Sequence, residues 1–573
     1  MSAGARALPF LASVGASLGA CASGDAGSGL SGLLITLDTT NPSALSCYGA
    51  PAGLTPNMDR LAREGVLYEN ARATAPVTAP SHASMLTGLY PLRHSVRMNA
   101  SMVLPESALT LAECARAKGL ETAAVVATVV LKREFGLGQG FERYDEPEGG
   151  PSSDPEAVVS RSCIEVTERA LAWLDERDST RPFFLWVHYF DPHGPYRPPD
   201  KFTQAAGGDA YLGEVAWVDK QLGRLLERLE QDGLLAETLV VLTADHGEGL
   251  GRHGEKTHGT MGFDSTLRVP LVVRYPDGWS AGERFADRVS LVDLYPTFGS
   301  ALGLDVHADV DGLDLWRRRV PEDRGLYFES YFGTIAYGWS QLAGWIDRDG
   351  KYVHTSVPEF YAADDPDEER DLLREGSADV SSKLDAIAAL CARRRHEQPG
   401  LGGPDADLQA QIEKLGYAGA GTEHFSLPEP LEASDRDSPH AHGEDYALFL
   451  RADSLLVRGR PDDALPLLLE VVAGDPRNHT ARHLYGQCLM HVGRFTSAIE
   501  ELERAILLRE GLWVAPHLDI ALCWEALGRN DEAIESYERA LAHGGGPAGA
   551  KERWAELLRK EGRAEEAARV EAE

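Results

Sequence analysis

Three apolar segments of the chain end in side chains that can bind cations or move protons. The segments are residues 33–37, 183–187 and 239–243, and the polar residues after them are Asp38; His188, Asp191 and His193; and Asp245 and His246. Carboxylates and imidazoles are common ligands of divalent cations, and imidazoles also transfer protons near neutral pH. One such residue could be a strand-end cap, but three segments that end this way predict a shared functional site.

The elements that would position these residues alternate along the chain. Continuous apolar segments of this length are typical of strands buried on both faces, as in a parallel sheet covered by helices. Helical stretches are expected between them at residues 58–64, 107–118, 163–176 and 212–230. The alternation predicts an α/β fold with a doubly wound, mostly parallel sheet. In such a sheet ligands bind beyond the carboxyl ends of the strands, where the polar residues lie.

Residues 74–94 read TAPVTAPSHASMLTGLYPLRH. This segment resembles the signature of the sulfatase family, in which Cys or Ser is followed by any residue, Pro, Ser and Arg, and later by Thr-Gly. Pro80-Ser81 and Thr87-Gly88 match in place. Further segments resemble the family in the same order, at residues 34–39, 243–248, 267–271 and 351–366. The resemblance covers about residues 30–375, and it implies the sulfatase branch of the alkaline-phosphatase superfamily.

The resemblance implies a divalent metal held by the aspartate after the first strand and by an acidic pair after a later strand. In this sequence those positions are Asp38, Asp245 and His246. Carboxylates with one imidazole suit Ca²⁺, Mg²⁺, Mn²⁺ or Zn²⁺, and the residue types alone do not separate these ions.

The departures from the family signature bear on the chemistry. Thr78 stands where the family converts Cys or Ser to formylglycine, which threonine cannot become, so no formylglycine is expected. His82 replaces the signature Arg, and Thr39 replaces a frequent second metal-binding aspartate. Asp38, Thr78, Asp245 and His246 instead resemble one metal site of the nucleotide pyrophosphatase/phosphodiesterase relatives, in which Thr is the nucleophile.

Thr78 is therefore predicted to be a metal-activated nucleophile, because a bound metal lowers the pKa of a hydroxyl. If a helix begins near Ser81, Thr78 precedes its N-terminus, where N–H groups favour an anionic ester. Two alternatives remain open at this stage: Thr78 positions a metal-bound water, or it is an inert replacement.

Two more histidines are candidate catalytic residues. His193, with His188 as the weaker alternative, matches a sulfatase histidine that contacts the ester, and His258 stands where many sulfatases carry a substrate-binding lysine. Asp191, His193 and His258 could form a second metal site. Acting alone, His258 could hydrogen-bond an ester oxygen or protonate the leaving group.

The C-terminal region repeats itself. Gly-Arg pairs begin at Gly459, Gly493, Gly528 and Gly562, and each pair is followed at one offset by an alanine: Ala464, Ala498, Ala533 and Ala567. A period of about 34 residues with Gly at a turn and Ala at a tight helix contact resembles tetratricopeptide repeats. The resemblance implies an all-α helical repeat domain that either binds a partner protein or serves a purely structural role.

The N-terminus resembles a bacterial lipoprotein leader, because Arg6 precedes an uncharged stretch that ends in Leu18-Gly19-Ala20-Cys21. Lipidation of Cys21 would make the protein an exported periplasmic or cell-envelope lipoprotein, attached to the membrane only through the lipid; an ordinary cleaved leader is the alternative. The expected organisation is a leader at 1–21, a tether at 22–32, a hydrolase domain at 33–395, a linker at 396–440 and repeats at 441–573.

The net charge of −33 argues against nucleic-acid binding, because phosphate backbones are bound by basic surfaces. The leading hypothesis is a metal-dependent hydrolase, sulfuric ester hydrolase-like or phosphodiesterase-like, that acts on an anionic sulfate or phosphate ester. The alternative is a catalytically idle scaffold whose repeats bind a partner protein. A third hypothesis, phospho-group transfer to a lipid or glycan, would usually bring several membrane spans, which the sequence does not offer.

Overall fold

The computed structural model describes residues 29–148, 160–399, 427–509, 513–541 and 549–572. The leader with Cys21, most of the tether and much of the predicted linker lie outside the described residues. None of the helices in the described ranges combines the length and apolar composition that a membrane span requires.

The centre of the fold is an eight-stranded mixed sheet in the order β4-β3-β5-β1-β6-β7-β2-β8. All neighbouring strands are parallel except that β7 runs antiparallel to β6 and β2. This confirms the predicted mostly parallel α/β sheet. The strands are β1 (Ser31–Leu37), β2 (Val66–Arg72), β3 (Glu121–Val125), β4 (Arg143–Asp145), β5 (Phe183–Tyr189), β6 (Thr238–Ala244), β7 (Arg268–Arg274) and β8 (Arg284–Ser290).

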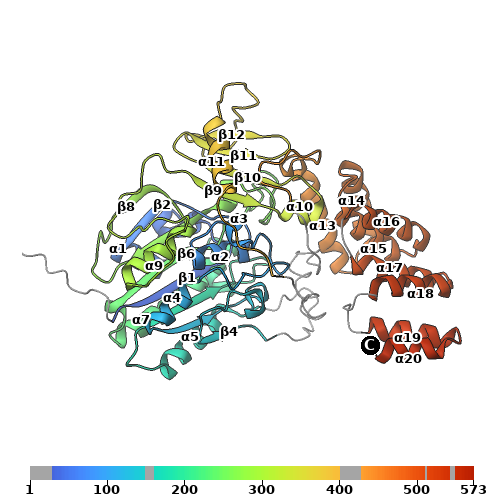
Figure 1. The fold of residues 1–573 in the computed structure, drawn as a ribbon, viewed down its shortest axis with the longest axis horizontal. Coiled ribbons are helices and arrows are strands. Elements are labelled where there is room, and N and C mark those ends of the chain that lie inside the picture. Colours follow the sequence, from blue (N-terminus) through green and yellow to red (C-terminus); the bar gives the residue numbers. More distant parts are fainter. Residues whose placement is uncertain (1–28, 149–159, 400–426, 510–512, 542–548, 573) are drawn as a thin grey trace, which may run out of the picture.

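Helices cover both faces of this sheet (Figure 1). One face packs against α1 (Pro56–Glu64), α5 (Cys163–Glu176) and α7 (Ala210–Gln231). The other packs against α2 (Thr78–Thr87), α4 (Leu111–Lys118) and α9 (Leu294–Leu302). Every residue of β1, β5 and β6 is buried, as the continuous apolar segments predict. Shorter helices of this part are α3 (Pro91–His94), α6 (Asp200–Ala205), α8 (Asp264–Leu267) and α10 (Phe332–Tyr337).

A smaller antiparallel sheet follows in the chain, in the order β12-β11-β10-β9. Helix α11 (Ser381–Cys391) packs against it through Ile387 and Leu390. Its strands are β9 (Leu326–Ser330), β10 (Leu342–Ile346), β11 (Gly350–His354) and β12 (Glu359–Ala362).

The C-terminal region is all-helical, as predicted. Its helices form four consecutive pairs: α13 (Gly443–Val457) with α14 (Pro461–Gly474), α15 (His479–His491) with α16 (Phe495–Leu508), α17 (Val514–Ala526) with α18 (Asn530–Leu541), and α19 (Ala550–Lys560) with α20 (Ala564–Ala572). The four repeated glycines all have positive φ between 69° and 78°, at the turn inside each pair. The four repeated alanines are fully buried. The period thus reflects a left-handed turn and a close helix contact in every pair.

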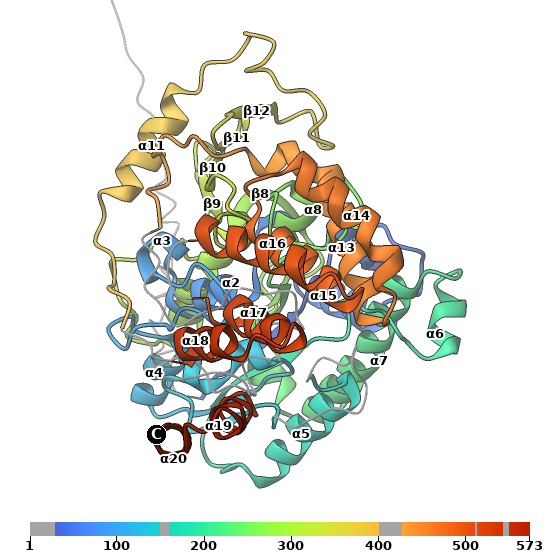
Figure 2. The same ribbon diagram turned by 90° about the vertical axis from the view of Figure 1, so that its right-hand side faces the viewer.

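The first repeat is packed directly against the α/β part of the chain, and the array extends from there along one side of it (Figure 2). Tyr446 and Phe449 of α13 join Tyr337 and Trp339 in the same hydrophobic core as the central sheet. The Thr257 hydroxyl lies 3.0 Å from the Tyr446 hydroxyl. The repeats therefore touch the loop that carries His258.

Candidate active site

The two candidate metal-binding aspartates lie side by side at the carboxyl edge of the central sheet. Leu37 of β1 pairs with Ala244 of β6, so Asp38 and Asp245 follow directly on neighbouring parallel strands. Both side chains are fully buried. Neither carboxylate oxygen of Asp38 has a hydrogen-bond partner. Asp245 has partners at Oδ1 but none at Oδ2.

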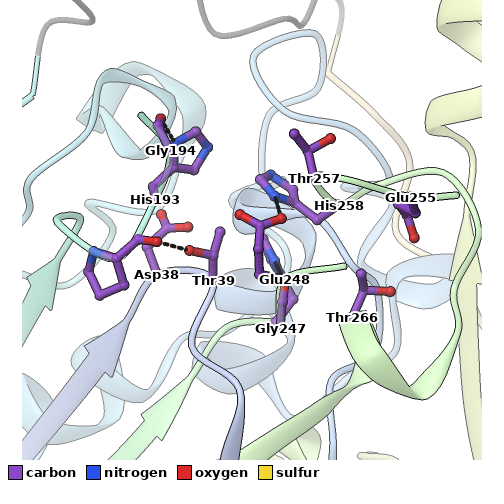
Figure 3. A network of polar contacts seen from close by, with 12 residues as sticks. Asp38, Thr39, His193, Gly194, Gly247, Glu248, Glu255, Thr257, His258 and Thr266 are labelled. Atoms are coloured by element: carbon purple, nitrogen blue, oxygen red, sulfur yellow. Dashed lines mark hydrogen bonds and ion pairs between the residues drawn. The ribbon is translucent and has the colours of Figure 1, made fainter. Parts of the chain in front are cut away.

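Asp245 is held by two backbone N–H groups. Its Oδ1 accepts from Thr39 N at 3.2 Å and from His246 N at 2.8 Å. Thr39 adopts the left-handed conformation, with φ 49°, which a threonine rarely adopts. Its hydroxyl donates to Pro192 O at 2.8 Å, so Thr39 connects the end of β1 to the loop after β5 (Figure 3). Thr39 thus supports the site through its backbone and does not supply a carboxylate.

His246 is oriented with one nitrogen toward the aspartates. Its Nδ1 lies 3.0 Å from Gly247 O, and a carbonyl oxygen only accepts, so Nδ1 carries the proton. Nε2 then presents its lone pair, 3.5 Å from Asp245 Oδ2 and 3.4 Å from Thr78 Oγ1. This tautomer is the one that a metal-bound histidine needs.

A divalent cation fits this arrangement. Ligand atoms of Asp38, Asp245 and His246 lie within 4.8 Å of one another. Burial raises the pKa of Asp38, and burial together with the Asp38 charge raises the pKa of Asp245. Burial tends to lower the pKa of His246, but the two carboxylates outweigh it and raise the pKa. Three buried oxygens without hydrogen bonds are costly unless a cation compensates them.

Thr78 is the first residue of α2, three residues earlier than the helix start expected from the sequence. Few N–H groups of this terminus are left for an anion. Ala79 N donates to Asn99 Oδ1 at 2.7 Å, Pro80 has no N–H, and Ser81 N donates to Val77 O. The predicted helix N-terminal anion site is therefore reduced to the N–H of Thr78 at most.

Asn99, to which the sequence analysis assigned no role, lies beside the first turn of α2. Its side chain is fully buried, and its Oδ1 is fixed by Ala79 N, so the amide orientation is determined. Its Nδ2 has no hydrogen-bond partner. A buried amide donor next to the first turn of α2 can compensate for the donors that the helix lacks. No sequence pattern identifies this residue, because the folding of the loop after α3 is what brings Asn99 next to Ala79.

His258 lies beside both His246 and His193. The His258 ring centroid is 4.4 Å from that of His246 and 5.1 Å from that of His193. His193 Nδ1 lies 2.7 Å from Gly194 O, which leaves its Nε2 as an acceptor. Burial lowers the pKa of both His193 and His258. Both imidazoles are therefore neutral near neutral pH.

Glu248 was not assigned a role from the sequence, but it belongs to this group. It lies 3.2 Å from His258 Nδ1 and accepts from the Tyr196 hydroxyl at 3.1 Å. Burial raises the pKa of Glu248 to about 7, although His193 and His246 lower it. Because the pKa of His258 is lowered well below its usual value, a proton shared by this pair resides on Glu248.

His188 and His82 lie behind the candidate ligands. His188 Nε2 is 3.3 Å from Asp38 Oδ2, and its Nδ1 faces Ala127 N. His82 Nδ1 is 2.8 Å from Thr78 O, and its Nε2 is 3.1 Å from the Thr36 hydroxyl. Burial lowers the pKa of His82 to about 3 and that of His188 to about 4. The neutral His188 ring therefore lies beside Asp38 without a hydrogen bond to it, and the neutral His82 ring supports the first turn of α2.

Asp191, the third residue of the predicted second metal site, is hydrogen-bonded at the start of α5. Its Oδ1 accepts from Cys163 N at 2.9 Å, at the start of α5. Among the described residues, no group of three candidate ligands within 4.8 Å includes Asp191. The structure brings only His193 and His258 of this set together.

The chain is similar in sequence and in fold to known hydrolases. Residues 32–304 match the Sulfatase family model, and residues 449–511 match a tetratricopeptide repeat model. Mouse steryl-sulfatase is 26% identical over 402 residues, which covers 49% of this chain and 64% of that protein. A multifunctional alkaline phosphatase superfamily protein of Trinickia caryophylli is 26% identical over 425 residues, covering 52% of this chain and 81% of its own length. The structure of a phosphonate monoester hydrolase of Agrobacterium radiobacter superposes with a TM-score of 0.53 at 23% identity, covering 63% of this chain and 95% of that one.

The unpartnered carboxylate of Asp38 should lower the stability of the metal-free protein. We expect Asp38→Asn to raise the free energy of unfolding of the metal-free protein by about 1–2 kcal/mol at pH 7, because it removes an unpartnered buried charge. The same variant should lose the stabilisation that added divalent metal gives the parent protein. Thermal unfolding with and without chelator measures both effects.

Asp219→Asn is the matched control. This buried carboxylate accepts hydrogen bonds from Asn57 N, Asn57 Nδ2 and Met58 N. Its neutralisation should therefore destabilise the protein by about 1–3 kcal/mol. If Asp38→Asn destabilises the metal-free protein as Asp219→Asn does, Asp38 is compensated in a way that the structure does not show.

Proposed function

We propose that this chain, whose residues 32–304 belong to the sulfatase family of the alkaline-phosphatase superfamily and precede tetratricopeptide repeats, is a metal-dependent hydrolase of sulfate esters or related phosphate and phosphonate esters. The observation that carries the proposal is the set of buried, unpartnered carboxylate oxygens of Asp38 and Asp245 beside His246 and Thr78. An idle scaffold would gain stability by losing such charges, so their presence together argues for catalysis.

Asp38, Asp245 and His246 would hold the cation, with Thr78 beside them. When bound, a divalent cation supplies positive charge that lowers the pKa of the Thr78 hydroxyl and offsets the charge of the ester. The residues fit Ca²⁺, Mg²⁺, Mn²⁺ or Zn²⁺.

Thr78 would act as the nucleophile. Its hydroxyl loses the proton to solvent, and Oγ1 attacks the sulfur or phosphorus atom as the bond to the leaving alcohol breaks. The Glu248–His258 pair holds the proton that the leaving alcohol needs. In the second step His193 Nε2 accepts a proton from the water that attacks the sulfur or phosphorus atom, and the bond to Thr78 Oγ1 breaks. Thr78 Oγ1 and the Glu248–His258 pair then take up protons from solvent, and His193 releases its proton to solvent, which restores the starting state. Asn99 Nδ2 would donate a hydrogen bond to a non-bridging oxygen of the ester.

The charge of the site favours monoanionic substrates. Two aspartates offset one divalent cation, and Glu248, with a pKa of about 7, adds a partial negative charge. A dianionic phosphate monoester would meet more repulsion here than a sulfate ester, phosphodiester or phosphonate monoester. We therefore infer that monoanionic esters are hydrolysed in preference to phosphate monoesters.

The repeats would bind a protein partner, and the leader would export the protein. The period of the repeats and their match to the tetratricopeptide model support the first inference. The residues around Cys21 support the second.

Substitution of Thr78 tests the nucleophile. We expect Thr78→Ala to lower kcat by at least about 10³-fold, whereas Thr78→Ser, which keeps a hydroxyl, retains measurable turnover. Chelation should abolish activity, and added divalent metal should restore it. The assay covers an aryl sulfate, a phosphodiester, a phosphonate monoester and a phosphate monoester. Activity that is indifferent to both Thr78→Ala and chelation would refute the proposal.

Substitution of Asn99 tests the amide donor. Asn99→Ala should lower kcat about 10²-fold with little change in KM, because the bond to the ester oxygen strengthens in the transition state. Asn70→Ala, which removes a partly exposed amide that donates to Ala286 O, serves as the control. Equal turnover of the two variants would exclude this role for Asn99.

Labelling tests the lipid anchor. Cells that express the full-length chain should incorporate radioactive palmitate into it, and Cys21→Ser should remove the label and release the protein from the membrane fraction. Unchanged labelling in Cys21→Ser would place the lipid elsewhere.

A further inference from the structure

A second cluster of potential ligands lies where the first repeat meets the rest of the chain. It consists of Asp437, His442 and Asp475, whose candidate ligand atoms lie within 4.8 Å of one another. Asp437 precedes α13, His442 directly adjoins it, and Asp475 caps the end of α14. The cluster is separate from the site at Asp38 and uses none of its residues.

His442 is oriented by its surroundings. Its Nδ1 lies 3.3 Å from Asp445 Oδ2, and its ring stacks on Trp339 with centroids 5.0 Å apart and planes 9° apart. The residue is 5% exposed, and its Nε2 has no hydrogen-bond partner. A carboxylate at Nδ1 favours the tautomer with its proton on that nitrogen, which leaves a lone pair at Nε2.

That lone pair faces two carboxylates. His442 Nε2 lies 3.7 Å from Asp437 Oδ2 and 4.0 Å from Asp475 Oδ2. Asp475 is buried, and its Oδ2 is fixed by a 2.7 Å hydrogen bond from Trp339 Nε1. A lone pair and two anionic oxygens that converge in this way repel one another unless a cation lies between them.

We propose that Asp437, His442 and Asp475 bind a divalent transition-metal ion of the zinc type. One imidazole nitrogen and two carboxylate oxygens are a ligand set that Zn²⁺ accepts, with bonds of about 2.0–2.2 Å. Two ligands of one such ion are separated by about 4.4 Å or less, so both histidine–carboxylate distances are compatible. Asp437 is on the solvent side, which gives the ion a route of entry and room for a water ligand.

The ion would fasten the first repeat to the α/β part. Its ligand Asp475 follows α14 and accepts a hydrogen bond from Trp339, in the segment after α10. Its ligand His442 contacts Asp445 of α13. Gly443, beside His442, packs against the loop of His258, since a Cβ at Gly443 would lie 2.7 Å from His253 O. The metal is therefore a structural one that fixes the repeats against the candidate active-site loop.

Zinc binding by the full-length chain tests the proposal. The background carries Asp38→Asn and Asp245→Asn, which removes both carboxylate ligands of the candidate active-site metal. After removal of metal, titration with Zn²⁺ against a chromophoric chelator should show one ion per chain. His442→Gln and Asp437→Asn should each weaken binding at least about ten-fold. Zn²⁺ should also raise the thermal unfolding midpoint of the background protein but not of these two variants.

His491→Gln, on the exposed end of α15, is the control and should bind Zn²⁺ as the background does. Asp437→Asn decides the matter if His442→Gln fails to fold, because the Asp437 side chain is 62% exposed. Absence of a bound ion in the background protein, or equal affinity in Asp437→Asn, would overturn the proposal.

Discussion

The site depends on one electrostatic constraint: two carboxylates are held close together, out of water, at the ends of adjacent strands. Asp38 follows β1, which lies between β5 and β6 in the interior of the sheet, and Asp245 follows β6. Parallel pairing of the backbones brings the ends of these two strands to one edge of the sheet, and no attraction between the two side chains is needed. The repulsion between the carboxylates is sustained because the fully buried strands beneath them make the sheet stable. The hydrogen bonds of Thr39 and His246 to Asp245 then fix one carboxylate in place while leaving its second oxygen uncompensated.

The loop after β6, which begins at Asp245, is held by hydrogen bonds and by packing. Between residues 245 and 258 this loop contributes Asp245, His246, Glu248 and His258 to the site. Asn41 clamps Glu248 by accepting from its N–H at 2.9 Å and donating to its carbonyl at 2.8 Å. Farther along, the loop rests on the first repeat, through Tyr446. A repeat helix thus packs against the loop of His258, so the array is structurally joined to the candidate active site.

Sequence patterns predict the parts of this structure that follow from local periodicity. The apolar segments before Asp38 and Asp245 identify buried parallel strands, and parallel pairing alone then requires their ends to meet. The glycine and alanine period likewise identifies each helical turn. Asn99 could not be found in this way, because its position depends on how the loop after α3 folds back onto α2. Asp191 is two residues from His193, but closeness along a loop does not determine the direction of a side chain, and one oxygen of its carboxylate accepts from the start of α5.

The residues around Thr78 also explain why the family signature can change without loss of the site. The signature has an arginine at the position of His82, whereas His82 is buried and neutral, with a pKa lowered to about 3 by burial. It therefore adds no charge, and it holds the Thr78 carbonyl and the Thr36 hydroxyl instead. With Ala79 and Ser81 N–H groups already engaged, the donors left near Thr78 are a neutral amide and the helix-start N–H. Replacing a cation by neutral donors makes the pocket less positive, and a less positive pocket discriminates against a second negative charge on the ester. A neutral histidine at position 82 is therefore consistent with our proposal that Thr78 attacks monoanionic esters directly.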